Sequence, residues 1–204
     1  MVHQKPKPSY HPFRLTGKIA KIFSLKKNQY VILKFFLIVI TGCTKGIGLC
    51  YAKELAKRNM NLILIARKVD LLNDIANEIR NQYQVKVEVI IADFGDESFI
   101  YTNIEERLAD KDIGILVNNV GVANEGLKYF HDETKEKMWN MINVNIGAMT
   151  MMSKIVLPRM EAKKKGAIIN VSSAASFSPN PFLTMYSATK AYVNFFSRGT
   201  VLFE

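Results

Sequence analysis

A tyrosine and a lysine four positions apart, Tyr186 and Lys190, are the pair in this sequence whose spacing best suits proton transfer. On a helix, residues i and i+4 lie on one face, so the phenol and the ammonium would be neighbours. A nearby positive charge favours the phenolate, which lets a phenol donate and accept protons near neutral pH. An amphipathic helix with a lysine lying along apolar surface would show the same spacing. The pair therefore predicts chemistry only if other residues supply a cofactor and partners.

Length and composition indicate one globular domain. The 204 residues suffice for a buried core, and 49% hydrophobic and 23% charged residues are ordinary proportions. Cys43 and Cys50 do not make a disulfide framework, which favours an intracellular setting. His3, His11 and His131 are scattered without metal-ligand spacing, so no metal site is predicted.

The net charge of +10 is concentrated at the N-terminus, where eight lysines and arginines precede residue 35 and the first acidic residue is Glu54. We expect residues 1–34 to form a basic extension, irregular or weakly helical. It is either solvated or in contact with an anionic membrane surface, and it gives no reason to expect a nucleic-acid partner. The apolar segment 30–40 is too short to span a bilayer, and Lys34 interrupts it. It also lacks the cleavage site of a signal peptide.

Beyond the extension, short β-branched runs alternate with longer helical patterns. The predicted strands are 35–40, 61–66, 85–92, 113–118 and 167–171, and the predicted helices are 47–57, 69–82, 97–109, 134–163 and one from about residue 185. The strand runs are almost continuously apolar, as expected when both faces of a sheet are covered. Residues 35–204 therefore predict an α/β fold, a doubly wound Rossmann-type parallel sheet with helices on both faces.

A glycine-rich turn follows the first predicted strand and opens a helix, with the sequence TGCTKGIG at residues 41–48. In this context the N–H groups at a helix N-terminus bind phosphate. Gly42 would permit the tight turn, Gly46 the approach of a pyrophosphate, and Gly48 close packing of helix on strand. A purely structural connection between strand and helix is the alternative, but the apolar strand before the turn favours nucleotide binding.

The end of the second strand indicates which nucleotide binds. Strands that bind NAD usually end in an acidic residue for the ribose 2′-hydroxyl, whereas this one ends in Arg67 and Lys68. Arg67 can form a bidentate pair with a 2′-phosphate, and Lys45 in the turn adds positive charge. Unless Arg67 and Lys68 are simply solvated, these cations favour NADP(H).

Three further motifs complete a resemblance to the short-chain dehydrogenases/reductases, from about Phe35 to the last residue. They are NNVG at 118–121, NVSS at 170–173 and YSATK at 186–190. Ser173 precedes Tyr186 by thirteen residues, which is the family's spacing. Asn145 stands thirteen residues before Pro158, as the family's helix-borne asparagine does, with Asn143 as its close competitor.

The resemblance implies that a ketone and a secondary alcohol are interconverted. Tyr186 would act as general acid and Ser173 would donate a hydrogen bond to the carbonyl oxygen. Lys190 would make Tyr186 easier to ionise and hold the nicotinamide ribose, while Asn145 would hold a water that relays protons. The implied cofactor-binding residues are Gly42, Thr44, Lys45, Gly46, Ile47, Gly48, Arg67, Asp93 beside the adenine, Asn119, Gly121, Tyr186 and Lys190.

The loop between Ser173 and Tyr186 is expected to contact the substrate. Its candidates are Phe177, Pro179, Pro181 and Phe182, of which Phe182, with Ser173, is the substrate contact we predict. Hydrophobic residues on the long helical pattern are instead expected to pack in the core or between helices. They are Met138, Trp139, Met149, Met151 and Met152.

Three phrases resemble the branch of 17-beta-hydroxysteroid dehydrogenases and very-long-chain 3-oxoacyl-CoA reductases: YAKELA at 51–56, IGILVNNVG at 113–121 and YSATK at 186–190. That branch implies NADPH, a lipid-like or steroid substrate and the endoplasmic reticulum membrane, with the cytoplasm as the alternative location. The family continues beyond the position of Glu204, so we expect a sheet without its C-terminal strands and a possible homodimer that covers the open edge. The alternative function is a truncated, catalytically weak NADP-binding protein with a scaffold or sensing role.

Overall fold

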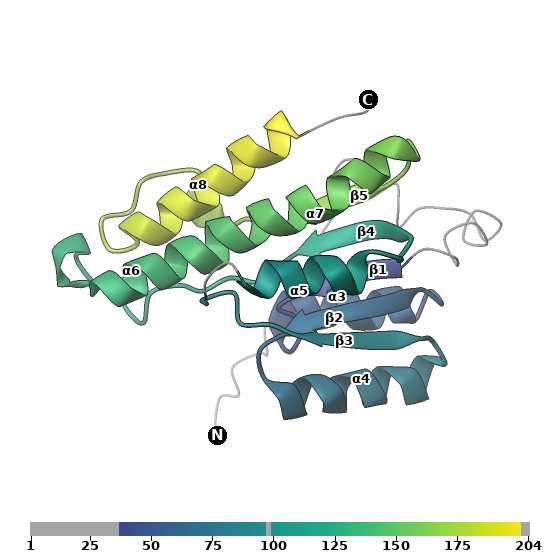
Figure 1. Ribbon diagram of the computed structural model, residues 1–204. Coiled ribbons are helices and arrows are strands. Elements are labelled where there is room, and N and C mark those ends of the chain that lie inside the picture. The colour runs from purple at the N-terminus through teal and green to yellow at the C-terminus, as the bar shows by residue number, and fades with distance from the viewer. Residues whose placement is uncertain (1–36, 97–98, 201–204) are drawn as a thin grey trace, which may run out of the picture.

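The structure, a computed structural model, describes residues 37–96 and 99–200, in which strands and helices alternate (Figure 1). Its strands are β1 Leu37–Thr41, β2 Asn61–Ala66, β3 Val87–Ile91, β4 Ile113–Asn118 and β5 Ala167–Asn170. Its α-helices are α3 Gly46–Ala56, α4 Val69–Tyr83, α5 Phe99–Leu108, α6 Lys135–Ile142, α7 Ala148–Ala162 and α8 Thr184–Gly199. The predicted basic extension 1–34 and its membrane contact lie outside the described residues.

The five strands form one parallel sheet in the order β3-β2-β1-β4-β5. Because the chain leaves β3 at one edge and returns in β4 on the other side of β1, the strand order reverses between β1 and β4. Loops at the carboxyl ends of these two strands diverge to opposite faces, which opens a crevice for ligands in folds of this kind. The predicted doubly wound α/β fold is confirmed.

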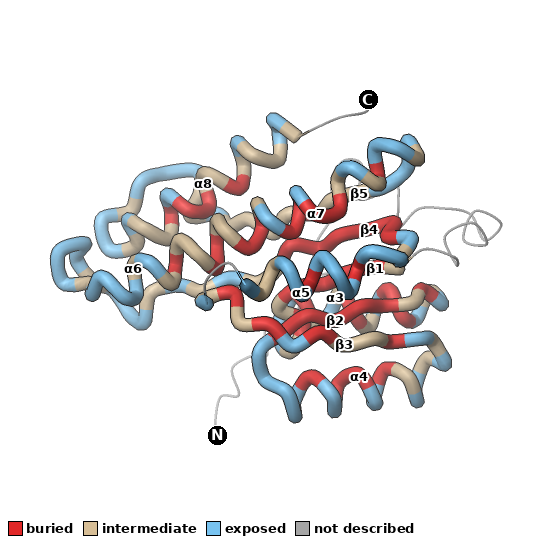
Figure 2. The backbone as a smooth tube through the Cα atoms, viewed as in Figure 1, coloured by how far each residue is buried: buried red, intermediate tan, exposed pale blue. Residues whose placement is uncertain are grey.

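Alternate residues of each central strand enter two separate cores. Ile38 and Ile40 of β1 pack on one face of the sheet with apolar residues of α3 and α4. Val39, between them, packs on the other face with α5 and α7. Figure 2 shows the buried segments concentrated along the central strands and the inward sides of these helices. Both faces are therefore covered, which is why the strands are almost continuously apolar in sequence.

The helical pattern predicted at 134–163 forms one continuous helix in which a single turn is π-helical rather than α-helical. Thr134 caps its start, because the Thr134 hydroxyl accepts a hydrogen bond of 3.3 Å from the backbone N–H of Lys137. The middle, η2 (Asn143–Gly147), is a π-helical turn that joins α6 to α7. Short π segments widen a helix locally and are frequent at functional sites. This turn contains Asn143 and Asn145, the two candidates for the catalytic asparagine that the family carries on this helix.

None of the helices in the described part of the chain is long and apolar enough to cross a membrane.

Candidate active site

A cleft of about 530 Å³ opens at the carboxyl ends of the strands, where the strand order reverses. Residues from the glycine turn, the end of β2, the end of β3, the loop after β4 and helix α8 line it. The predicted site residues among its lining are Gly42, Thr44, Lys45, Gly46, Ile47, Arg67, Asp93, Asn119, Gly121, Tyr186 and Lys190. Residues far apart in sequence thus meet in one cleft that runs from the glycine turn to the Tyr-x-x-x-Lys helix.

The loop after β4 anchors the glycine turn. The Asn119 amide nitrogen donates to the backbone oxygens of Thr41 and Gly42, at 3.0 and 2.9 Å. The Thr41 hydroxyl in turn accepts from the backbone N–H groups of Asn119 and Val120, at 3.0 and 3.1 Å. Gly42 has φ +64°, and a Cβ there would lie 2.7 Å from the Val120 Cα. The turn is therefore shaped by contacts with a segment more than seventy residues away.

Gly46 and Gly48 have different surroundings. A Cβ on Gly48 would lie 2.4 Å from the Asn119 amide nitrogen and 2.5 Å from the Gly42 oxygen, so only glycine fits. At Gly46, with φ +55°, a Cβ would meet no atom within 4 Å. Gly46 begins α3 and lines the cleft, so open space lies in front of a helix N-terminus. These residues fit a phosphate group, which such backbone N–H groups bind.

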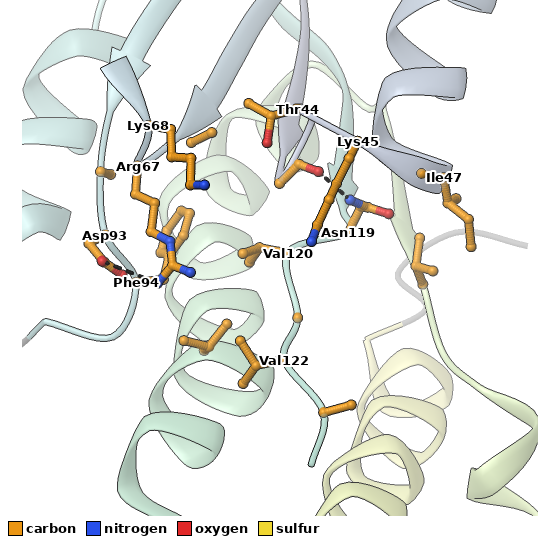
Figure 3. A pocket seen from close by; sticks show the side chains of 18 of the residues that line it. Thr44, Lys45, Ile47, Arg67, Lys68, Asp93, Phe94, Asn119, Val120 and Val122 are labelled. Atoms are coloured by element: carbon orange, nitrogen blue, oxygen red, sulfur yellow. Dashed lines mark hydrogen bonds and ion pairs between the residues drawn. The ribbon is translucent and has the colours of Figure 1, made fainter. Parts of the chain in front are cut away.

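Three cations from two segments, the glycine turn and the residues after β2, line one end of the cleft. Figure 3 shows Lys68 beside Arg67, Lys45 extending from the glycine turn, and the Arg67 guanidinium reaching toward Asp93. Arg67 Nη1 lies 3.5 Å from Asp93 Oδ2, and the two side chains are 58% and 40% exposed. Such a cluster of cations is suited to an anion like a 2′-phosphate.

The predicted proton-transfer pair lies at the other end of the cleft. Lys190 is buried, and its ammonium donates a 3.0 Å hydrogen bond to the Val171 oxygen. The Lys190 Nζ atom lies 5.8 Å from the centre of the Tyr186 ring. Burial lowers the pKa of Lys190, because removal from water disfavours the charged form. The helix α8 thus presents both side chains to one space, as the four-residue spacing predicts.

Asn145, rather than Asn143, faces this pair. Its amide accepts from the Val122 N–H at 2.8 Å and donates to the Val122 oxygen at 2.9 Å and the Thr189 hydroxyl at 3.0 Å. A Cβ on Gly121 would lie 3.3 Å from Asn145 Oδ1 and 3.5 Å from Lys190 Nζ. The Asn143 amide instead donates to the Gly95 oxygen at 3.4 Å. The π turn therefore joins the loop after β4 to helix α8 through Asn145.

The two predicted substrate contacts do not line this cleft. The Ser173 hydroxyl accepts from the Ala175 N–H at 3.2 Å and caps the short 3₁₀ helix η3 (Ala174–Ser176). Phe182 is 36% exposed, and its ring centre lies 5.1 Å from that of Tyr129. The neighbouring residue Ser172, which the sequence did not single out, does line the cleft. The substrate roles of Ser173 and Phe182 stay predictions.

Sequence reasoning missed several contributors to the site. The apolar residues Leu71, Phe94, Val122 and Val144 line the cleft. Their positions next to recognised motifs were the only available signal.

A buried polar network that joins four elements was also missed. The Asn118 amide donates to the Ser153 hydroxyl at 3.2 Å and to Asn170 Oδ1 at 2.8 Å, and the Asn170 amide donates to the Ser197 hydroxyl at 2.9 Å. It links the ends of β4 and β5 to α7 and α8, and so helps to place the helix of Tyr186.

The expectation of helix packing was right for Met149 and Met152, which are buried, and wrong for two other residues. Trp139 in α6 is 64% exposed and Met151 in α7 is 38% exposed, so both lie on the solvent-facing side of this long helix.

The two cysteines are free thiols. Burial raises the pKa of Cys43 to about 12, so its thiol packs in the core and is a poor nucleophile at neutral pH. The described residues contain no group of three or more potential metal ligands.

A doubly wound sheet with a phosphate-compatible glycine turn at its switch point defines a dinucleotide-binding type of α/β domain. The chain belongs to the short chain dehydrogenase family, whose profile matches residues 37–202. The predicted family and branch are confirmed.

The chain is 48% identical to the "Very-long-chain 3-oxoacyl-CoA reductase" of Anas platyrhynchos, over 79% of this chain and 52% of that protein. It is also 48% identical to the "Inactive hydroxysteroid dehydrogenase-like protein 1" of Homo sapiens, over 79% of this chain and 49% of that protein. Among solved structures, a short-chain dehydrogenase from Sphingobium yanoikuyae in complex with NADPH is 36% identical with a TM-score of 0.76, covering 80% of this chain and 64% of that one. The chain spans about half the length of the curated relatives it matches.

Proposed function

We propose that this chain binds NADP(H) and interconverts a ketone and a secondary alcohol on a lipid-like substrate, a 3-oxoacyl thioester or a steroid. The observation that carries the proposal is a single cleft with three cations at one end and Tyr186 with Lys190 at the other. The NADPH complex of the Sphingobium relative supports the cofactor. The name of the Anas relative supports the acyl thioester.

The cofactor would be held along the cleft by this chain's own groups. Backbone N–H groups at the start of α3 would bind the pyrophosphate in front of Gly46, and Arg67, with Lys45, would bind the 2′-phosphate. Asp93, Asn119 and Gly121 would contact the rest of the cofactor. When bound, NADPH supplies the hydride that reduces the carbonyl carbon.

Negative charge develops on the carbonyl oxygen as hydride arrives, so a proton donor must already be in place. Tyr186 would give its phenol proton to that oxygen, and in the reverse direction the phenolate would accept it. The ammonium of Lys190, held by the Val171 oxygen, would stabilise the phenolate. Ser173 would donate a second hydrogen bond to the same oxygen.

Asn145 would act on this pair by positioning it. Its amide bonds to Val122 and Thr189 hold the loop that carries Gly121 against α8, where Lys190 lies. The proton-relay water expected beside Asn145 stays a prediction.

Substitution of one hydroxyl tests the enzymatic proposal. Tyr186→Phe should weaken NADPH binding, followed by fluorescence titration, far less than it lowers turnover, because most of the expected cofactor contacts remain. It should lower turnover of a 3-oxoacyl-CoA or of estrone by on the order of 10²–10⁴-fold, the usual contribution of a general acid. Tyr192→Phe on the same helix is the matched control, because the Tyr192 hydroxyl pairs with Thr150 and does not line the cleft.

A non-catalytic NADP-binding protein is the second candidate. The name of the human relative, which begins with "Inactive", favours it. NADPH binding with no turnover of either substrate, and no difference between the wild type and Tyr186→Phe, would support this candidate and overturn the enzymatic one.

A further inference from the structure

Asp93 occupies an unusual electrostatic position in the cleft. Of the described residues that line the cleft, it is the only carboxylate, and the lining also contains four cations, Lys45, Arg67, Lys68 and Lys190. Among the ion pairs of the described residues, Arg67 has one, with Asp93 at 3.5 Å. The cation best suited to a 2′-phosphate is thus already next to an anion of the protein (Figure 3).

The carboxylate of Asp93 is held in place from the other side. Its Oδ1 atom accepts a 3.0 Å hydrogen bond from the backbone N–H of Gly95, while Oδ2 faces Arg67. A Cβ on Gly95 would lie 3.3 Å from Asp93 Oδ1, so the loop approaches the carboxylate closely. Asp93 is therefore a pre-positioned acceptor, because rotation of its carboxylate away from Arg67 would break the hydrogen bond from Gly95.

We infer that Asp93 competes with the 2′-phosphate of the cofactor for Arg67 and thereby limits the preference for NADPH over NADH. The inference rests on the proposed function, because it concerns how the NADP(H) site is tuned. A guanidinium shared between a carboxylate and a phosphate stabilises each anion less than it would stabilise that anion alone. The two anions also repel each other. NADH lacks the 2′-phosphate, so its affinity is not subject to this competition.

The expected size of the effect follows from the exposure of the pair. Both side chains are about half exposed, and exposed ion pairs contribute roughly 0.2–1 kcal/mol, which corresponds to about 1.4- to 5-fold in affinity. Asp93→Asn removes the charge and keeps an oxygen that can accept from Gly95. The ratio of the NADH to the NADPH dissociation constant should therefore rise about 1.4- to 5-fold. A contact of residue 93 with the adenine affects both cofactors equally and cancels in this ratio.

A double-mutant cycle with Arg67 separates competition from general repulsion. In an Arg67→Ala background, Asp93→Asn should change the ratio less than in the wild type, because no guanidinium is left to compete for and only the repulsion between the two anions remains. Asp96→Asn is the matched control, since Asp96 is an exposed carboxylate of the same loop and does not line the cleft. It should leave the ratio within about 1.3-fold of the wild type at equal ionic strength.

Fluorescence and calorimetric titrations of NADPH and NADH against the wild type and the four variants decide the question. A second neutral variant, Asp93→Ser, also keeps a hydrogen-bond acceptor and guards against a misfolded Asp93→Asn, which circular dichroism would reveal. An unchanged or lower ratio in folded Asp93 variants, or an equal gain in the Arg67→Ala background, would overturn the competition while leaving the cofactor assignment intact. If the wild type bound neither cofactor, the proposed function itself would fall, and the competition with it.

Discussion

The two ends of the cleft are constructed differently. At the nucleotide end, hydrogen bonds from the Asn119 side-chain amide and close backbone approaches hold the glycine turn against the loop after β4. At the end where the substrate is expected, Phe177 is 83% exposed and Phe182 is 36% exposed, and the Phe182 ring contacts Tyr129, which is itself exposed. The comparison suggests that the nucleotide end tolerates little change, whereas the substrate end can vary at small cost in stability.

The largest effect is expected from Gly48→Ala. The new methyl group would overlap the Asn119 amide and the Gly42 oxygen, so the turn and its anchor must separate. Overpacking of this kind costs roughly 3 kcal/mol in the free energy of unfolding, measurable by urea titration. Gly199→Ala is the control, because a Cβ there meets nothing within 4 Å. Equal stability of the two variants would contradict the rigid packing assigned to the nucleotide end.

A somewhat smaller loss is expected from Asn145→Ala in the π turn. The substitution leaves the Val122 backbone groups and the Thr189 hydroxyl without their shared partner in a buried place. Unsatisfied buried groups cost about 1–3 kcal/mol, and the weakened loop should also reduce NADPH affinity. Asn143→Ala removes one long hydrogen bond of 3.4 Å and should cost less. A larger loss of stability for Asn143→Ala than for Asn145→Ala would show that the thirteen-residue spacing to Pro158 selected the wrong asparagine.

The buried ammonium of Lys190 predicts a dependence of stability on pH. Its pKa in the folded protein is lowered below 10.5 by burial, so the folded protein releases this proton at a lower pH than the unfolded chain. Between these two values the unfolded state binds more protons, and the stability of the wild type relative to Lys190→Met therefore rises with pH. Below the lowered pKa the difference is constant. Urea unfolding of both proteins from pH 7 to 10.5 measures it, and a falling difference would contradict the burial.

The smallest effect is expected at the exposed end. Phe177→Ser should change the free energy of unfolding by less than about 0.5 kcal/mol, because an exposed ring buries little apolar surface. If the loop contacts substrate, the same variant should raise KM for a 3-oxoacyl-CoA without changing NADPH affinity. A large loss of stability in Phe177→Ser would contradict the proposed difference between a closely packed nucleotide end and an exposed substrate end of the cleft.

Local patterns predicted most of the fold. The strands predicted at 61–66 and 113–118 match β2 and β4 residue for residue. Short, uninterrupted apolar runs bounded by polar residues are typical of buried strands. The one predicted at 85–92 extends past both ends of β3, where pairing with β2 begins at Val87 and ends at Ile91. Strand ends depend on hydrogen-bond partners in another segment, which a local pattern does not contain.

The sequence by itself determined the alternation of strands and helices, the glycine turn and the spacing of Tyr186 and Lys190, since these depend on neighbours within a few positions. Tertiary structure alone decided that Asn119 anchors the turn, that Asn145 joins a loop to α8 and that Asp93 lies beside Arg67. These features are contacts between segments 23 to 78 residues apart, and their geometry exists only once the sheet has brought the strand ends together.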